Sequence, residues 1–560
     1  MDINGARTLD IKRIKLSPTD DKPKDASLDK NETDAENFKA DDDDGNGTGD
    51  ISLVYKALED SPFELDGDPA YGLCLIAKRD LKAGELLHDD IPAFFGPSAD
   101  LVQDYSTPLC LGCCVVMNDG NGENRCPTCN WPICGDDCDN VEHHKANECS
   151  LFVKHNVQFP PNVEIQPCYK AIAIIRGLLI KERNPEMWEQ LMTLQWKTQL
   201  QLTPFPDFEE IKENFGLAEF GRAEDWTRVL GIINVNSYSF QRIEKKEGSP
   251  SFGECLFPIY SLMCHSCTPN CTWAIQYSPE FTMKVRPTVD IKKGEMLSVS
   301  YNHEFSKFGF YKRQEKIRER AEFECKCWRC RDARDLGTNL AAVKCFKCKE
   351  GYMLPEDASD FEMDWKCDKC PYVMSPEFIS SFVESLYEQS DMAEDEAEET
   401  GESVVKIFED FIASNSSVKV HSNHWVIAEA AHAIVKLQAS NLSKLTLEEL
   451  NKFIDFCKYL LQIKNVIAPG FSNERGMLHH YLARGYYMKV KLLLNSNTLK
   501  ATLSQEEMES IYNVQKYALR FWKENPHYES LTENYKREPE YLMQEAEEIK
   551  LLLDGSDVPK

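Results

Sequence analysis

The sequence lacks any apolar run long enough to cross a membrane, and its basic residues are outnumbered by its acidic ones. Its richest apolar run, residues 171–180, is interrupted by Arg176, whereas a membrane-spanning helix needs about 20 apolar residues. Residues 1–21 contain no apolar signal core, so we expect an intracellular protein without a membrane anchor. Lys and Arg total 64 against 93 Asp and Glu, and the net charge of −29 argues against a protein that coats nucleic acid.

Cysteine, in contrast, is abundant, with 22 residues grouped mostly in C-x2-C and similar short spacings. Thiols stay reduced inside cells, where disulfides are rare. We therefore predict that the clustered cysteines bind zinc and do not form disulfides.

The length allows three or four domains, and 42% hydrophobic residues are enough for real hydrophobic cores. Strand-rich and helix-rich segments along the chain predict an α+β multidomain protein. The helical C-terminus contains two capping-box signatures, Thr446-x-x-Glu449 and Ser504-x-x-Glu507, each ahead of an amphipathic run. The predicted segments, in chain order, are a disordered acidic tail (1–50), strands (51–105), a cysteine-dense segment (106–150), helices (151–229), strands (230–305), two further cysteine-rich segments (306–332 and 333–375) and successive helices (376–560).

The first cysteine-dense segment has enough ligands for two tetrahedral zinc ions. Two C-x2-C pairs each place two thiolates on one tight turn, and Cys134-x3-Cys138 suits the start of a helix. So short a segment cannot build a hydrophobic core unaided, so the metals would supply its folding energy. The candidate ligands are Cys110, Cys113, Cys126, Cys129, Cys134, Cys138, Cys149 and one of His143 and His144.

Two more zinc sites are predicted further along the chain. One has only three local thiolates, so a distant residue must complete it, and Cys267 is the best candidate. The other consists of two C-x2-C pairs about twenty residues apart, which is typical of a zinc ribbon. Their ligands are Cys267, Cys325, Cys327 and Cys330 for the first, and Cys345, Cys348, Cys367 and Cys370 for the second.

The order C-x2-C, C-x2-C, C-x3-C, H-x4-C resembles a MYND zinc finger. The resemblance implies interleaved sites, in which the first and third pairs hold one zinc and the second pair, His144 and Cys149 hold the other. The usual final spacing is H-x3-C, so His143 stays an alternative to His144. The heptapeptide 264–270 (CHSCTPN) resembles the N-H-S-C-x-P-N motif of SET-domain methyltransferases, whose cysteine joins a post-SET C-x-C-x2-C zinc.

A SET domain split by a MYND finger resembles the SMYD family of lysine methyltransferases, and the added ribbon is similar to the arthropod SmydA branch. Four further segments carry this resemblance, which covers residues 55–375: 71–73 (YGL), 79–85 (RDLKAGE), 233–238 (INVNSY) and 294–301 (GEMLSVSY). It implies SET parts at 51–105 and 230–305, a helical SET insertion at 151–229, a post-SET segment at 306–332 and a tetratricopeptide-like C-terminus. It also implies nuclear and cytoplasmic locations and a role in transcription.

The resemblance further implies methyl transfer from S-adenosylmethionine to a protein lysine, on a histone or another protein. Tyr301 would orient the lysine amine. Asn236 and His265 would hold the amino-acid and ribose parts of the cofactor, and Phe323 would pack on its adenine. The MYND finger would bind proline-rich peptides, and we expect no direct DNA binding because the fingers carry few Lys or Arg.

The sequence departs from the family pattern at two positions on the cofactor side. Cys264 stands where the family has asparagine, and a thiol is a poor hydrogen-bond donor. Tyr71 stands where the family's opening motif has arginine. The alternative function is therefore an inactive SET/MYND scaffold that recruits protein partners in transcriptional repression.

Overall fold

The computed structural model describes residues 48–554 with internal gaps. These are 69–70, 99–107, 118–123, 136–137, 139–140, 158, 160–165, 198–211, 214, 216, 218–219, 244–249, 277–280, 322, 359, 361 and 525–536. The predicted disordered tail, 1–50, lies almost wholly outside the described residues.

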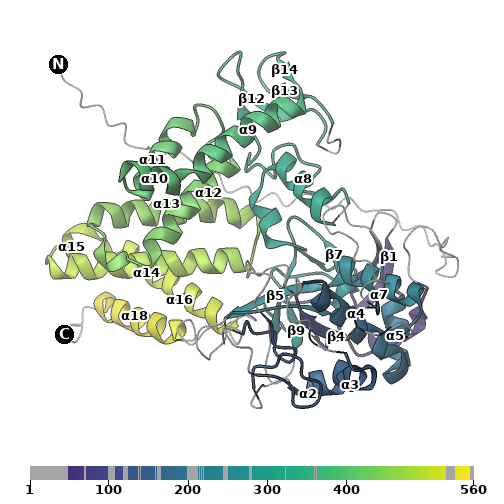
Figure 1. Ribbon diagram of the computed structural model, residues 1–560. Coiled ribbons are helices and arrows are strands. Elements are labelled where there is room, and N and C mark those ends of the chain that lie inside the picture. Colours follow the sequence, from purple (N-terminus) through teal and green to yellow (C-terminus); the bar gives the residue numbers. More distant parts are fainter. Residues whose placement is uncertain are drawn as a thin grey trace.

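The N-terminal lobe, residues 48–321, is built around small β-sheets (Figure 1). Its first hairpin buries Phe63 and Leu65 and exposes Glu64 and Asp66, an alternation that gives the sheet one apolar face. The sheet orders are β1–β2, β3–β9–β8, β4–β6–β5 and a parallel pair of β10 with β7. The strands are β1 (Phe63–Asp68), β2 (Gly72–Ala77), β3 (Asp89–Asp90), β4 (Phe94–Pro97), β5 (Tyr238–Ile243), β6 (Pro250–Leu256), β7 (Cys264–His265), β8 (Cys271–Gln276), β9 (Thr282–Pro287) and β10 (Ser298–Val299).

Helices separate β4 from its partner β6 in the sequence. The helix predicted from apolar spacing after residue 165 is confirmed as α4, which buries Tyr169, Ile172 and Ile175 and packs on β4. Helical elements of the lobe are α1 (Ile51–Ala57), α2 (Val141–His144), the π-helical turn η2 (Lys145–Cys149), α3 (Ser150–His155), α4 (Gln166–Arg183), α5 (Pro185–Met192), α7 (Ala223–Asn236), η3 (Tyr260–Leu262), η4 (His303–Lys307) and α8 (Phe310–Ala321).

Two sequence-based assignments in this lobe are wrong. Residues 233–236 were expected in a strand but form the last turn of α7, and the strand begins only at Tyr238. Helix α7 buries Trp226, Val229 and Leu230, so tertiary packing outweighs the strand propensity of its β-branched residues. Residues 51–57, expected in a strand-rich segment, form α1, whose N-cap Asp50 accepts a hydrogen bond from the Ser52 N–H at 2.9 Å.

A small four-stranded sheet connects the N-terminal lobe to the helical lobe, residues 376–553. Its strands pair in the order β11–β12–β13–β14: β11 (Val343–Lys344), β12 (Tyr352–Pro355), β13 (Trp365–Cys367) and β14 (Val373–Met374). The helical lobe comprises α9 (Pro376–Asp391), α10 (Ala393–Thr400), α11 (Val404–Asn415), α12 (Trp425–Ala439), η5 (Leu442–Lys444), α13 (Leu447–Ile467), α14 (Asn473–Asn495), α15 (Leu499–Thr502), α16 (Gln505–Glu524) and α18 (Glu538–Leu553).

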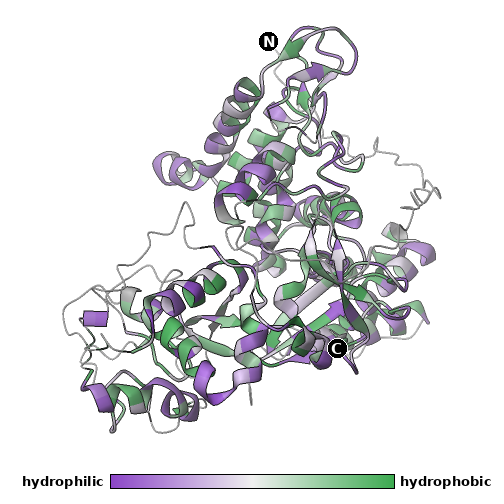
Figure 2. Cartoon of the chain, turned by 90° about the vertical axis from the view of Figure 1, so that its right-hand side faces the viewer, coloured by the Kyte–Doolittle hydropathy of each residue, from purple (hydrophilic) through white to green (hydrophobic). Residues whose placement is uncertain are grey.

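The helical lobe begins its helices where the sequence predicts. At α13, Thr446 and Glu449 exchange both hydrogen bonds of a capping box, and Ser504 and Glu507 do the same ahead of α16. Most helices mix hydrophobic and hydrophilic residues along their length, as Figure 2 shows by colour. No helix among the described residues is long and apolar enough to span a membrane.

The two lobes meet at a backbone-to-backbone contact. The Phe471 N–H donates to the Thr288 carbonyl at 2.8 Å, next to Gly470. Gly470 has a φ of +72°, and a Cβ atom there would lie 1.7 Å from the Thr288 oxygen, so only glycine fits. An ion pair between Lys307 and Glu429 at 3.2 Å adds to the same seam. The lobes are therefore in direct contact.

Acid should weaken the helical lobe through His424. This fully buried side chain caps α12, and its Nδ1 accepts from the Val426 N–H at 3.4 Å. Burial lowers the pKa of His424 to about 3, so the folded protein holds it neutral and the unfolded chain binds a proton near pH 6.5. The stabilisation that neutral His424 gives the folded protein is complete above pH 6.5. Below that pH, the free energy of unfolding falls by up to about 1.4 kcal/mol per pH unit.

Urea unfolding at pH 7.5 and pH 5.0 measures this dependence. In His424→Asn, which keeps a capping acceptor, we expect the loss of stability between the two pH values to be smaller by about 2 kcal/mol. An equal loss in the variant and the wild type would contradict the assignment.

Candidate functional site

Fifteen cysteines and one histidine form four groups, and within each group the ligand atoms lie within 4.8 Å of one another. These are the same four groups of residues that the sequence analysis proposed as zinc ligands. They are Cys110, Cys113, Cys134 and Cys138; Cys126, Cys129, His144 and Cys149; Cys267, Cys325, Cys327 and Cys330; and Cys345, Cys348, Cys367 and Cys370.

The separations of the sulfur atoms fit zinc. Four thiolates at a Zn–S distance of about 2.3 Å around a tetrahedral ion lie about 3.8 Å apart. The Sγ–Sγ distances are 3.7 Å for Cys110–Cys138, 3.6 Å for Cys113–Cys134 and 3.7 Å for Cys345–Cys370. A disulfide would need about 2.05 Å, so the geometry fits metal ligation and excludes disulfides at these pairs.

Main-chain N–H groups point at the sulfurs and favour thiolates. The N–H groups of Gly112 and Cys134 donate to Cys110 Sγ at 3.3 and 3.2 Å. In the last group, the main-chain N–H groups of Gly351 and Glu350 lower the pKa of the Cys348 thiol to about 6. Because metal ligands must be deprotonated, these donors prepare the sites for a cation.

The first two groups interleave along the chain, and the second resolves the choice between the two histidines. His144 Nε2 lies 3.3 Å from Cys129 Sγ, among the ligand atoms. The ring of His143 instead stacks on Phe95 with the centroids 3.9 Å apart, and burial lowers the pKa of His143 to about 3. His144 is the residue placed to bind metal.

The unusual H-x4-C spacing has a structural explanation. Residues 145–149 form the π-helical turn η2 between α2 and α3. Its backbone is kinked at Asn147, where φ is −106° and ψ is −109°, and this kink accommodates the extra residue so that His144 and Cys149 still converge. Cys134 and Cys138, expected at the start of a helix, instead precede α2, which begins at Val141, and their ligand positions come from irregular backbone.

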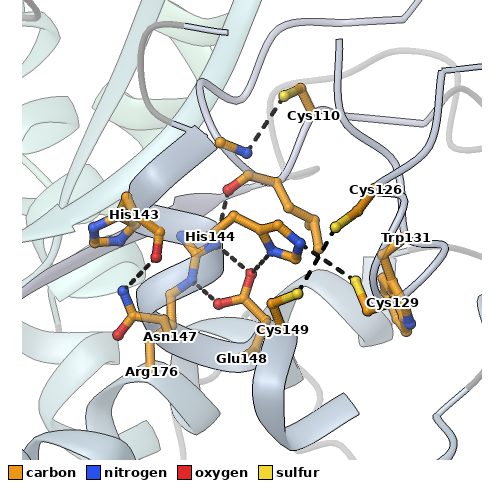
Figure 3. Close-up of polar contacts among 12 residues, drawn as sticks. Cys110, Cys126, Cys129, Trp131, His143, His144, Asn147, Glu148, Cys149 and Arg176 are labelled. Atoms are coloured by element: carbon orange, nitrogen blue, oxygen red, sulfur yellow. Dashed lines mark hydrogen bonds and ion pairs between the residues drawn. The ribbon is translucent and has the colours of Figure 1, made fainter. Parts of the chain in front are cut away.

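A buried charge network surrounds His144 (Figure 3). His144 Nδ1 lies 2.7 Å from Glu148 Oε1, and Arg176 Nε donates to Glu148 Oε2 at 2.7 Å. Burial alone would raise the pKa of Glu148, but the Arg176 guanidinium and His144 outweigh it and hold the pKa at about 2. Sequence analysis missed both Glu148 and Arg176, since charged residues in a helix usually face solvent.

The third group joins two distant parts of the chain. Cys267 Sγ lies 3.8 Å from Cys325 Sγ and 3.5 Å from Cys330 Sγ. Beside it, the Arg329 side chain donates to the main-chain carbonyls of Cys267 at 3.2 Å and Ser306 at 3.0 Å. A metal here would fasten the segment after α8 to the loop that follows β7.

Three of the four residues predicted for catalysis and cofactor binding come together next to this group. β10 pairs with β7 in parallel, with Val299 opposite His265, and Tyr301 follows β10. The Tyr301 N–H donates to His265 Nδ1 at 3.1 Å. The ring of Phe323 lies 5.7 Å from that of His265 and 6.1 Å from that of Tyr301, centroid to centroid.

Tyr301 presents its side chain partly to solvent, with 45% of the residue exposed. Its hydroxyl donates to the Met263 carbonyl at 2.9 Å, so the oxygen keeps lone pairs that can accept from a ligand. His265 is buried, and burial lowers its pKa to about 4. Its Nε2 lies 3.3 Å from Cys267 Sγ, so its ring connects Tyr301 to the third group.

Asn236, the fourth predicted residue, ends α7. Its side-chain nitrogen donates to the main-chain carbonyls of Gln195 at 2.7 Å and Ile232 at 2.9 Å. The main-chain carbonyl of Asn236 accepts a hydrogen bond from the Ser261 hydroxyl at 3.2 Å, which connects the end of α7 to the segment before β7. With both amide protons used, the side-chain oxygen is the atom that Asn236 can offer to a ligand.

The two residues that depart from the family pattern lie at the same site. The Cys264 thiol donates to the Leu73 carbonyl in β2 at 4.0 Å, and the neighbouring Cys74 thiol and burial raise the pKa of Cys264. Tyr71 is partly buried near Cys325 and Cys327, and burial raises its pKa to about 12. The thiol of Cys264 therefore turns toward β2.

Comparison with known proteins agrees with this arrangement. Residues 72–302 match the family model of the SET domain. SET domain-containing protein SmydA-8, isoform A, of Drosophila melanogaster is 25% identical over 328 residues, which cover 58% of this chain and 68% of that protein. Histone-lysine N-methyltransferase ASHR1 of Arabidopsis thaliana is 23% identical over 377 residues, or 61% of this chain and 70% of that protein. Human histone-lysine N-methyltransferase SMYD3 is 32% identical over 108 residues, which cover 19% of this chain and 23% of that protein.

The fold and the comparisons together define a protein with a SET domain and four cysteine-rich groups that fit zinc. Within that class, the chain is a SMYD-like SET protein.

Proposed function

We propose that the protein is a protein-lysine methyltransferase that uses S-adenosylmethionine. The observation that carries the proposal is the convergence of His265 and Tyr301, inside the matched SET domain, with Phe323, which follows that domain in the sequence. Relatives whose names state histone-lysine methyltransferase activity are similar to this chain at 23% and 32% identity. The substrate would be a histone or another protein with an exposed lysine, and the protein would act in the nucleus and cytoplasm.

The residues present fit the cofactor, with one weakened contact. Phe323 offers an aromatic face for the adenine ring, the Asn236 side-chain oxygen can accept from the cofactor's ammonium group, and the partly exposed Tyr301 leaves the site open to ligands. Cys264 offers only a thiol, a poor donor, where the family has an amide. When bound, S-adenosylmethionine supplies an electrophilic methyl group on a sulfonium.

The protein's own contribution is to position and deprotonate the lysine amine. A lysine has an ordinary pKa near 10.4 and must be neutral to attack. Contact with Tyr301 would remove water from the amine and lower its pKa. The Tyr301 hydroxyl, fixed by its bond to Met263, would accept a hydrogen bond from the amine and orient its lone pair.

We further propose that residues 106–150 are a MYND finger for proline-rich peptides, that Cys267 with residues 325–330 forms a post-SET zinc site, and that residues 333–375 form a zinc ribbon. The convergence of each ligand group supports these assignments. The successive paired helices of the C-terminal lobe support a tetratricopeptide-like domain. A function in transcriptional regulation follows from these modules.

One observation favours a second function, that of a scaffold without catalysis. The Cys264 thiol donates to the Leu73 carbonyl and does not replace the missing amide donor, and Tyr71 replaces an arginine on the same side. Both changes remove polar contacts from the cofactor side and leave Tyr301 intact.

Calorimetric titration of the zinc-loaded protein with S-adenosylmethionine separates the two functions. The methyltransferase predicts binding, and Cys264→Asn should tighten it about tenfold, because one good hydrogen bond to a charged or polar group contributes about 1.4 kcal/mol. Cys264→Ala is the matched control and should leave affinity unchanged. Absence of binding at millimolar cofactor, in both the wild type and Cys264→Asn, would leave the scaffold as the function.

A further inference from the structure

A fully buried carboxylate–guanidinium pair lies behind the second metal group of the finger, as Figure 3 shows. Glu148 and Arg176 both have 0% side-chain exposure, and neither is a metal ligand. We propose that this pair is the outer coordination sphere of that group: it fixes His144 as an Nε2 ligand and couples metal retention to the attachment of the finger on strand β4. The proposal concerns metal binding and does not depend on the proposed methyltransferase activity.

The first step is the orientation of the imidazole. His144 Nδ1 is 2.7 Å from Glu148 Oε1, while Nε2 is 3.3 Å from Cys129 Sγ. An ionised carboxylate can only accept a hydrogen bond, so Nδ1 carries the proton and Nε2 keeps a free lone pair. That lone pair points at the three thiolates, which is the tautomer a metal ligand needs.

The second step is how Glu148 is held. A fully buried carboxylate needs hydrogen-bond partners for both of its oxygens. Arg176 supplies them with two parallel hydrogen bonds, Nε to Oε2 at 2.7 Å and Nη2 to Oε1 at 2.6 Å. A two-point contact of this kind fixes both the charge and the plane of the carboxylate.

The third step is where the rest of the guanidinium binds. Arg176 Nη2 also donates to the Leu111 carbonyl at 2.7 Å, and Nη1 donates to the Phe95 carbonyl. Leu111 lies between Cys110 and Cys113, two ligands of the first group, and Phe95 lies in β4. The Arg176 side chain, on α4, thus reaches the first metal group through the Leu111 carbonyl and the second through Glu148. It also binds the SET-domain sheet through the Phe95 carbonyl.

A purely structural ion pair would predict a different behaviour. If Glu148 and Arg176 only filled the interface, their loss would lower the stability of the protein and would not release one metal ion faster than the others. If the pair is an outer coordination sphere, its loss should lower the metal affinity of the second group about 10- to 100-fold and leave the affinities of the other three groups unchanged. Among the described groups the second is the only one with a histidine ligand, so its spectrum can be told apart.

The test uses the full-length protein, loaded with zinc or with cobalt. Zinc release to a chromogenic chelator is followed in the wild type and in Glu148→Gln, an isosteric change that removes the carboxylate charge. We expect one of four ions to leave about 10- to 100-fold faster in the variant. In the cobalt protein, the absorption bands of the three-sulfur, one-nitrogen site should weaken while those of the all-sulfur sites persist.

The control is Glu545→Gln, which breaks a carboxylate–guanidinium pair with Arg484 (2.6 Å) in the helical lobe, where Glu545 is buried and Arg484 is partly exposed, away from the metal groups. It should leave all four release rates unchanged. Should Glu148→Gln fail to fold, Glu148→Asp keeps the charge for Arg176 but shortens the reach to His144, and selective loss of the same ion is expected. Unchanged release in a folded Glu148 variant, or equal acceleration of all four ions, would overturn the proposal.

Discussion

Replacing Cys267 with serine should remove one zinc ion and destabilise the N-terminal lobe by at least about 3 kcal/mol, because structural zinc contributes about 10–16 kcal/mol of folding free energy at its site. The other three ligands, Cys325, Cys327 and Cys330, follow α8. Among the described residues, no other metal group joins this segment to the loop after β7. A hydroxyl at 267 is a weak ligand for zinc beside three thiolates. His265 would also lose the sulfur that lies 3.3 Å from its Nε2.

Metal content per chain, measured by plasma mass spectrometry, should fall from four to three in Cys267→Ser. The urea midpoint should fall with it. Cys271→Ala is the matched control: Cys271 is also buried in the next strand, β8, but belongs to none of the four groups, so it should retain four ions. Four ions and an unchanged midpoint in Cys267→Ser would contradict the assignment of the third group.

Replacing Tyr301 with phenylalanine should reduce methyl transfer at least about 100-fold, the scale of effect seen when one oriented polar group is removed from a reacting centre. The change removes only the hydroxyl that donates to Met263 and that would receive the lysine amine. Folding should weaken by only about 1 kcal/mol, since one hydrogen bond is lost. Cofactor affinity by calorimetry should stay the same.

Tyr238→Phe supplies the matched comparison. The Tyr238 hydroxyl donates to the Tyr260 carbonyl at the same distance, 2.9 Å, so both variants lose one equivalent hydrogen bond. We expect transfer to a peptide lysine to survive in Tyr238→Phe and to collapse in Tyr301→Phe. Equal rates in the two variants would remove the catalytic role of Tyr301 and would favour the scaffold function.

Local patterns in the sequence predicted much of this architecture. A C-x2-C spacing places two thiolates on one turn whatever surrounds it, so ligand pairs can be read without knowing the fold. The capping boxes at Thr446 and Ser504 likewise depend on three residues of separation, and both helices start there. Such signals depend on neighbours in the chain.

Features that depend on distant burial were not predictable in the same way. The β-branched residues at the end of α7 favour a strand locally, and only packing of Trp226 and Leu230 in the core makes them helical. Glu148 and Arg176 look like ordinary surface charges until α4 and η2 are placed side by side. The kink at Asn147, which allows His144 and Cys149 to converge, corresponds in the sequence to the one-residue excess in H-x4-C.

The position of the finger between two paired strands has a consequence for synthesis on the ribosome. β4 ends at Pro97 and its partner β6 begins at Pro250, so every finger ligand emerges before the sheet can close. At roughly 5–20 residues per second, the nascent chain would wait about 10–30 s between the two strands. Arg176 emerges within that interval and can hold the Phe95 carbonyl in place until β6 arrives. Zinc shortage during translation would therefore leave an unpaired strand exposed to chaperones and to aggregation.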